Sequence, residues 1–323
     1  MPARRFLLFV TGLPVVSACG AARPVRYVTV PPPTAQAISL LGDTLWNLSM
    51  DPADGQRRIE LLFRARDEVR ARPSETLLKL ELGRRTEGVG RFREAVGIYT
   101  EVIANGNMDP RWPRYRGETL IRIRELDAAI SDLALAARNN MSQRSIADYS
   151  EAPDGSSAWV TSLKFSTYFF LGVAHYLKGE FGTARSVLHE AAEHALTADD
   201  VVRVSLWLFF VAVREQKVDE AGFILGLITP DLPTISAQAE HRLLLAYQEG
   251  AAADSLPVDM TRPPRDAAEA TYAYGIGFGH LMLGRRDLAR TLFEQVIRAK
   301  DWSTLSYLAA ESELTRLRAA EKP

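Results

Sequence analysis

The sequence predicts an all-α protein in which pairs of helices repeat along the chain. Two observations support this fold class. Apolar residues recur at helical spacing through most of the 323 residues. Small residues recur at matching places in segments that start at 76 and 110, which are 34 residues apart, and at 202 and 270, two such periods apart. One helix pair cannot bury its apolar face alone, so the copies are expected to stack into a solenoid.

The composition and charge exclude several classes of protein. The chain has 39 Lys plus Arg and 40 Asp plus Glu, which gives a formal net charge of −1 and argues against a nucleic-acid-binding protein. Hydrophobic residues make up 47%, which is typical of a folded globular protein. The single cysteine, Cys19, excludes an intrachain disulfide and a multi-cysteine zinc site.

Residues 1–18 are interpreted as a signal peptide. Two arginines precede an apolar run over residues 6–16, which is too short to span a bilayer. The run ends in Val-Ser-Ala-Cys, which resembles the lipobox of bacterial lipoproteins. This resemblance implies that Cys19 is lipidated and becomes the first residue of the mature protein. Gly20 then implies export to the outer membrane, facing the periplasm, if the cell has two membranes. An ordinary secretory signal with a chance cysteine is the alternative.

Residues 19–36 are expected to form a tether between the lipid anchor and the folded part of the chain. They include three consecutive prolines, which favour an extended backbone. The repeat domain is then expected over residues 37–320.

The repeated segments resemble the tetratricopeptide repeat. In the first copy, Leu82-Gly83 stand at positions 7 and 8, Ala95 at position 20 and Tyr99 at position 24. The clearest copies start at 76, 110, 165, 202 and 270. The resemblance implies a right-handed superhelix of about six helix pairs with a C-terminal capping helix. Small residues at positions 8 and 20 would let the paired helices approach closely, and position 24 would fill the gap.

Several segments depart from the repeat. Phe209 stands at position 8 of the fourth copy, so that pair is expected to be splayed or shifted. The copy over 236–269 is degenerate, because a helix over 237–249 is followed by prolines that a helix interior cannot hold.

The flanking segments carry three further expectations. Residues 37–48 and 57–72 are expected to form an irregular helix pair, and 139–158 a polar surface loop. Residues 304–318 predict a helix that is apolar on one side and charged on the other, as a terminal cap requires.

No residue pattern points to catalysis, a metal or a cofactor. His189 and His194 are five residues apart, so they do not share a helix face as a zinc pair would. The glycines over 275–279 do not follow a predicted strand, so close helix packing explains them better than a nucleotide loop. His175 and His280 occupy the same repeat position, which favours packing. We therefore expect a protein that is not an enzyme.

The inner face is where the resemblance places ligand contacts, on the first helix of each pair. The early copies present mainly basic residues there, together with Tyr115 and Glu118, and the later copies present a large apolar stripe. The basic candidates are Arg84, Arg111, Arg114 and Arg122, and the apolar candidates are Phe169, Phe170, Val173, Tyr176, Trp207, Phe210, Tyr274 and Phe278.

A stripe of this size predicts that something covers it. One hypothesis is an apolar or amphipathic peptide with an acidic flank at the arginines. The alternatives are burial by the degenerate repeat or the terminal helix, and a homodimer.

The function expected from these features is a membrane-anchored scaffold that binds another cell-envelope protein. Two alternatives stay open. One is an accessory subunit of a machine that assembles outer-membrane proteins, pili or a secretion apparatus. The other is a lipoprotein that binds a ligand in an enclosed apolar pocket. A closed cavity with convergent polar groups would favour the pocket, and a wide continuous groove would favour the scaffold.

Overall fold

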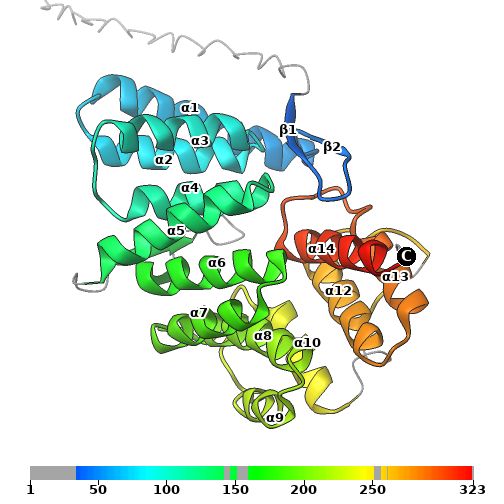
Figure 1. The fold of residues 1–323 in the computed structure, drawn as a ribbon. Helices are drawn as coiled ribbons and strands as arrows, with labels where there is room; N and C mark the ends of the chain where they lie inside the picture. Colours follow the sequence, from blue (N-terminus) through cyan, green and yellow to red (C-terminus); the bar gives the residue numbers. More distant parts are fainter. Residues whose placement is uncertain (1–33, 142–145, 151–158, 251–255, 260, 322–323) are drawn as a thin grey trace, which may run out of the picture. The chain divides into compact units, whose positions relative to one another are not determined.

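The computed structural model describes residues 34–141, 146–150, 159–250, 256–259 and 261–321. Over these residues the chain has the all-α helical-repeat fold that the sequence predicts (Figure 1). Residues 1–33 lie outside the described part, and with them the expected signal peptide, Cys19 and most of the tether. Within the described part, no helix is long and apolar enough to cross a membrane.

Helices that follow one another in the chain pack side by side. The long first helix, α1, packs on α2, and each later pair packs on the one before it. The helices are α1 Pro52–Ala71, α2 Thr76–Gly88, α3 Phe92–Ala104, α4 Arg111–Arg122, α5 Leu126–Asn140, α6 Leu163–Lys178, α7 Phe181–Glu193, α8 Ala198–Arg214, α9 Val218–Gly226, α10 Gln238–Gln248, α12 Ala267–Met282, α13 Arg286–Val296 and α14 Leu305–Ala320.

The structure shows why the period contains glycine at position 8. A Cβ on Gly83 would lie 2.1 Å from Cε1 of Tyr99, which occupies position 24 of the same copy. A Cβ on Gly172 would likewise lie 2.6 Å from Cγ of Leu188. These distances are too short for any real Cβ, so only glycine lets the paired helices come this close.

The fourth pair accommodates a phenylalanine where the other four clear copies have glycine. The ring of Phe209 packs on the ring of Tyr247 in α10, with centroids 4.7 Å apart. The partner helix α9 is only nine residues long. The bulk at position 8 is therefore taken up by contact with the degenerate copy, in which α10 packs against α8 and α12.

The expected helix over 37–48 is wrong. The segment forms a hairpin of β1 (Ala35–Ile38) and β2 (Thr44–Trp46), which pair antiparallel. A tight turn causes the reversal: the amide of Ser39 donates to the carbonyl of Asp43 at 2.8 Å, and Gly42 has a φ of +99°. Glycine adopts that angle without strain, which favours the turn over a helix.

The polar insertion before α6 also differs from the expected surface loop. Its described part includes β3 (Ala147–Ser150), which pairs antiparallel with β4 (Trp159–Ser162). Asp148 of β3 is only 2% exposed. The hydroxyl of Ser162 accepts a hydrogen bond from the amide of Phe165 at 3.0 Å, which caps α6 directly after the hairpin. The hairpin is thereby held beside the inner face.

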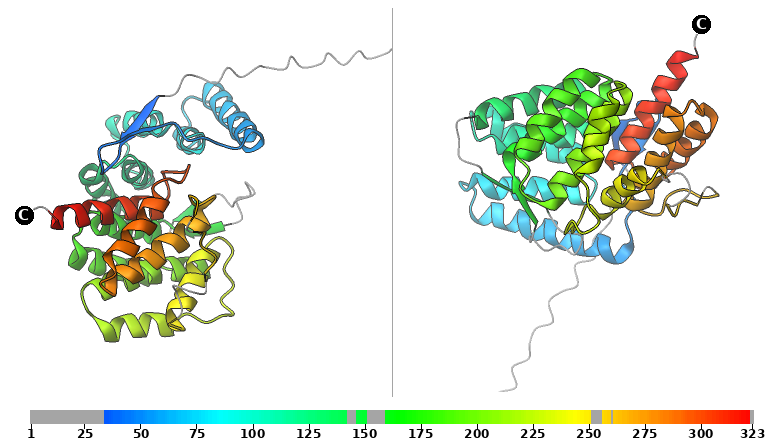
Figure 2. Two further views of the ribbon diagram at one scale, coloured as in Figure 1. Left: turned by 90° about the vertical axis from the view of Figure 1, so that its right-hand side faces the viewer. Right: turned by 90° about the horizontal axis from the view of Figure 1, so that it is seen from below.

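The C-terminal helix α14 forms where expected, but its charged side is not solvated. It packs against α6 and α12 as well as α13 (Figure 2). Glu311 and Glu313 are 1% and 0% exposed. Glu311 pairs with Arg124 at 3.0 Å, and Glu313 pairs with Arg214 and Arg316. The acidic side of α14 is therefore buried against arginine partners: Arg124 between α4 and α5, Arg214 at the end of α8, and Arg316 of α14 itself.

Candidate binding cavity on the inner face

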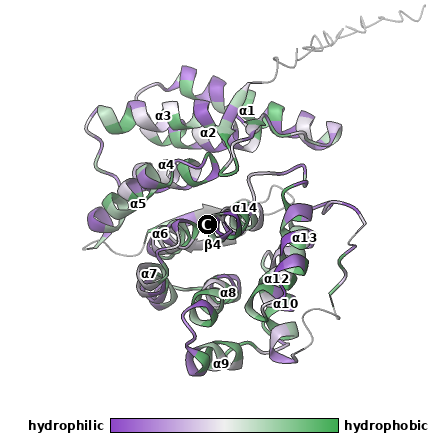
Figure 3. Cartoon of the chain, turned by 45° about the vertical axis from the view of Figure 1, so that its right-hand side comes forward, coloured by the Kyte–Doolittle hydropathy of each residue, from purple (hydrophilic) through white to green (hydrophobic). Residues whose placement is uncertain are grey.

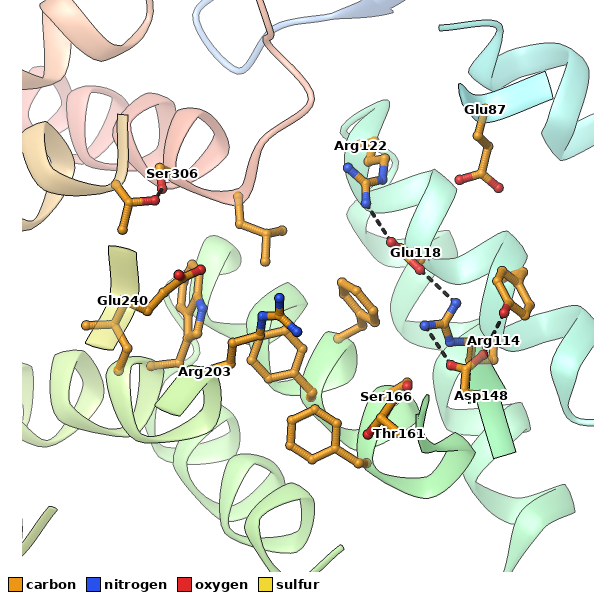
Figure 4. A pocket seen from close by; sticks show the side chains of 18 of the residues that line it. Glu87, Arg114, Glu118, Arg122, Asp148, Thr161, Ser166, Arg203, Glu240 and Ser306 are labelled. Carbon is orange, nitrogen blue, oxygen red and sulfur yellow. Dashed lines mark hydrogen bonds and ion pairs between the residues drawn. The ribbon is translucent and has the colours of Figure 1, made fainter. Parts of the chain in front are cut away.

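Where α14 leaves the inner face uncovered, a cavity of about 380 Å³ remains (Figure 4). This volume lies within the range of known small-ligand sites. Side chains of α2, α4, α6, α8, α10, α12 and the first turn of α14 line it, together with the β3–β4 hairpin. The lining residues form an ionic wall on α2 and α4, an aromatic wall on α6, α8 and α12, and a smaller polar group opposite α4.

The ionic wall is a chain of alternating charges. Glu118 of α4 accepts from Arg114 at 2.7 Å and from Arg122 at 2.6 Å. Arg114 also pairs with Asp148 at 2.8 Å, and Arg122 donates to the carbonyl of Ser303 at 3.0 Å. The spacing of four residues along α4 places these side chains on one face of the helix. The last contact ties the wall to the segment that precedes α14.

Two carboxyl groups on this wall have opposite electrostatic surroundings. Burial disfavours ionisation of Glu118, yet the charges of Arg114 and Arg122 hold its pKa below the usual range. Glu87 of α2 instead accepts from the hydroxyl of Tyr99 at 2.5 Å. Burial, with the nearby charge of Glu118, raises the pKa of Glu87 to about 7. Glu87 therefore changes its charge near neutral pH.

The aromatic wall is part of the hydrophobic core. The ring of Phe210 meets Trp207 and Tyr274 edge to face, with centroids 6.1 and 5.3 Å apart. Phe210 is only 1% exposed. Phe170 is less buried, and the guanidinium carbon of Arg114 lies 5.2 Å from its ring centroid. The two walls thus meet where Arg114 covers Phe170.

The remaining polar group comes from α8, α10, α12 and α14. Arg203 donates to the hydroxyl of Ser236 at 2.7 Å, and the hydroxyls of Thr271 and Ser306 lie 3.0 Å apart. Burial raises the pKa of Glu240, although the charge of Arg203 opposes this effect. The cavity therefore holds polar groups on two sides of an apolar centre.

The structure brings most of the inner-face candidates together at this cavity. Those that line it are Arg84, Arg114, Arg122, Phe169, Phe170, Trp207, Phe210 and Tyr274. The other four do not line it. Arg111 pairs with Asp109 at the start of α4, and Val173, Tyr176 and Phe278 are buried, at no more than 1% exposure. The hydroxyl of Tyr176 lies 2.8 Å from that of Tyr274 and donates to Glu313 at 3.2 Å, so α14 covers this part of the face.

The repeat register places Glu118 on the inner face, at position 9 of its copy, and the structure shows it in the lining. Glu87 was not among the sequence candidates. It stands at position 12, which is also an inner-face position, so the register could have found it. Asp148 lies in the insertion between copies, where no register applies. Only its pairing in the β3–β4 hairpin places it at the cavity.

His189 of the histidine motif contacts a carboxyl group of another helix. His189 lies 2.8 Å from Glu220 of α9, an ordinary pair between neighbouring helices. In the part of the chain that the structure describes, no group of three or more His, Cys, Asp or Glu could hold a metal ion.

Comparisons with known proteins give structural likenesses but no sequence match. No protein-family model matches the chain, and no curated protein matches its sequence. Among solved structures, the chain is similar to a tetratricopeptide repeat protein from Parabacteroides merdae, with 14% identity and a TM-score of 0.47. The match covers 81% of this chain and 94% of that one.

Proposed function

We propose that this protein is a membrane-anchored, non-enzymatic scaffold that holds a short segment of another cell-envelope protein in the inner-face cavity. The observation that carries the proposal is the cavity with its two unlike walls. An apolar side chain fits against the aromatic wall, and polar groups of the same segment reach the ionic wall. Helical-repeat folds with such inner faces serve mainly to bind other proteins.

The position of α14 limits what the inner face can hold. This helix covers the part of the face around Tyr176, whose hydroxyl donates to Glu313 of α14 at 3.2 Å. A long helix or strand that follows the whole face would have to displace buried ion pairs of Glu313, which is costly. A short segment in the remaining cavity requires no such displacement.

The membrane anchor is a separate part of the proposal and rests on the Val-Ser-Ala-Cys sequence at residues 16–19. Lipidation of Cys19 would attach the protein to the membrane, with the outer membrane facing the periplasm as the proposed site. A Cys19→Ser variant should be released into the soluble fraction of the envelope. If that variant stays with the membrane, the anchor is contradicted.

Photo-cross-linking in cells tests the binding function. The photoreactive residue p-benzoylphenylalanine replaces Ser306, which lines the cavity, or Ser186, which is exposed on the outer helix α7. The full-length chain should cross-link to one short segment of a partner from position 306 and to none from position 186. Equal cross-linking from both positions, or none from 306, would contradict the proposal.

Binding of a free small molecule is the second candidate, and the convergent walls of the cavity favour it. Native mass spectrometry of the purified protein distinguishes small-molecule binding from the scaffold function. A bound molecule of constant mass, retained by the wild-type chain without any peptide, would establish the small-ligand function. The scaffold function predicts that no such molecule is retained.

A further inference from the structure

We propose that the cavity selects a short apolar segment carrying an acidic side chain, and that Glu87 takes up one proton from solvent when this side chain binds. The inference rests on the function proposed above, because it assigns the chemistry of the segment that the same cavity holds.

The charges of the lining argue against a basic segment. The lining includes four arginines and four carboxyl groups, so its formal net charge is zero when all are ionised. Arginine keeps its proton in proteins, whereas a carboxyl group can be neutralised. The net charge therefore stays at zero or becomes positive, and it favours an anion. The charged residues are Arg84, Arg114, Arg122, Arg203, Glu87, Glu118, Asp148 and Glu240.

Geometry singles out Glu87 as the group that neutralises. Both Arg114 and Arg122 direct their donors to Glu118, at 2.7 and 2.6 Å. Glu87 has the hydroxyl of Tyr99 at 2.5 Å in place of an arginine donor. Arg84 of the same wall pairs with Glu81 at 3.2 Å. Once Glu87 is neutral, the ionic wall is more positive by one charge than before, which favours an anionic ligand.

Charged groups from each neighbouring helix act on Glu87. Burial and the charge of Glu118 raise its pKa, and Tyr99 and Arg122 oppose that rise, with a balance at about 7. The charge of Glu87 also acts on Arg114 of α4. Arg84 lies about one turn before Glu87 on α2, and Arg58 of α1 donates to the carbonyl of Gly88 at 3.1 Å. A carboxylate that enters the cavity adds a second negative neighbour. It therefore favours the protonated form of Glu87, and binding and protonation reinforce each other.

Arg114 offers a place for the acidic side chain. Its Nε is buried and has no hydrogen-bond acceptor among the described residues. The same guanidinium covers the ring of Phe170. A segment with neighbouring acidic and apolar side chains would therefore put the acid beside Arg114 and the apolar group against the aromatic wall. Hydrogen bonds between two ionised groups are the strong ones, so this contact would dominate selection.

Calorimetric titration with three matched peptides tests the inference. The peptides are acetyl-Phe-Asp-amide, acetyl-Phe-Asn-amide and acetyl-Phe-Lys-amide, and the protein is the full-length chain in detergent. At pH 6 the Asp peptide should bind about tenfold more tightly than either other peptide. Its affinity should fall about tenfold between pH 6 and pH 8, since Glu87 loses its proton over that range. Repeating the pH 8 titration in buffers of different ionisation enthalpy should show uptake of about one proton.

Two variants separate Glu87 from a general effect of pH. Glu87→Gln carries a permanently neutral group, so it should bind the Asp peptide about equally at pH 6 and pH 8. Its binding enthalpy should not depend on the buffer, because no proton is taken up. Glu94→Gln, on the exposed side of α3, should keep the pH dependence of the wild-type chain.

Equal binding of the three peptides, or a pH-independent affinity for the Asp peptide, would overturn the inference. If cross-linking from position 306 is still observed together with those results, the proposed scaffold function is kept and only the acidic-segment inference is overturned. If that cross-linking is also absent, the scaffold function is contradicted as well.

Discussion

Two clusters of arginine and carboxylate side chains in this molecule use the same chemistry in different surroundings. In the α14 cluster, Glu313 meets Arg214 and Arg316, and its side chain is 1% exposed. In the cavity cluster, Glu118 meets Arg114 and Arg122, and its side chain is 13% exposed. Protein encloses Glu313 at the centre of the first cluster, although the side chain of Arg316 is 26% exposed, whereas the second cluster faces a cavity.

Buried ion pairs alone therefore do not indicate a binding site. The α14 cluster joins helices that are far apart in the sequence. The cavity cluster adds an open side and Glu87, which accepts from the hydroxyl of Tyr99 at 2.5 Å. Burial and the charge of Glu118 raise the pKa of Glu87 to about 7. Figure 3 shows that the surroundings differ as well: α2 is largely hydrophilic, and hydrophobic residues dominate α8 and α12. We expect the α14 cluster to control stability and the cavity cluster to control binding.

Removing the central carboxylate of the α14 cluster should give the largest effect. Glu313→Ala leaves two arginines near the core without their partner, which should lower the free energy of unfolding by about 3–5 kcal/mol. Urea unfolding measures the change. As the matched control, Glu321→Ala removes an exposed partner of Arg290 and should cost less than about 1 kcal/mol. Similar losses of unfolding free energy in the two variants would contradict the distinction between buried and exposed ion pairs.

Replacing Glu87 should raise the stability of the folded chain, whereas replacing Glu313 should lower it. Its pKa of about 7 lies above the usual value of 4.5, so the folded state keeps a proton that the unfolded state has lost. Stability due to this group is fully present below pH 4.5 and is lost as the pH rises through 7. Glu87→Gln should therefore raise the free energy of unfolding by up to about 3 kcal/mol at pH 8, with little change near pH 4.5.

The two carboxyl groups give a paired test in pH titrations of stability. The arginines hold the pKa of Glu313 below its usual range despite burial. Its contribution is therefore present above pH 4.5 and is lost as the pH falls. Urea midpoints of the two variants are measured against the wild-type chain from about pH 3 to about pH 8. The loss in Glu313→Ala should shrink as the pH falls below 4.5, and the gain in Glu87→Gln should grow as the pH rises above 4.5. A common pH dependence would contradict the electrostatic assignment of both groups.

A smaller effect is expected at the start of α14. The hydroxyl of Thr304 accepts from the amide of Tyr307 at 3.3 Å and caps the helix. Thr304→Ala should cost about 1 kcal/mol in urea unfolding. The first turn of α14 lines the cavity, so this variant should also weaken peptide binding. Thr304→Ser keeps the cap and should restore both properties.

The sequence predicted the repeat packing because that packing is local. Gly83 and Tyr99 lie within one copy, and their contact follows from the spacing alone. The same register placed eight of the inner-face candidates at the cavity.

Features that depend on distant contacts or on short turns were missed. The burial of Glu313 requires Arg214, about a hundred residues earlier, so its charge was expected to face solvent. The β1–β2 hairpin depends on one turn at Gly42, within a segment too short for a clear helical or strand period. Asp148 reaches the cavity only through strand pairing inside an insertion.

Blocking the cavity tests whether a partner segment binds there. Ser306→Trp places a large side chain at the cavity, and Ser186→Trp places the same side chain on the exposed face of α7. The measurement is the affinity for acetyl-Phe-Asp-amide at pH 6, with urea unfolding to confirm that both variants are folded. The account predicts that Ser306→Trp loses at least about tenfold in affinity and that Ser186→Trp binds as the wild-type chain does. Unchanged binding by a folded Ser306→Trp variant would contradict the account.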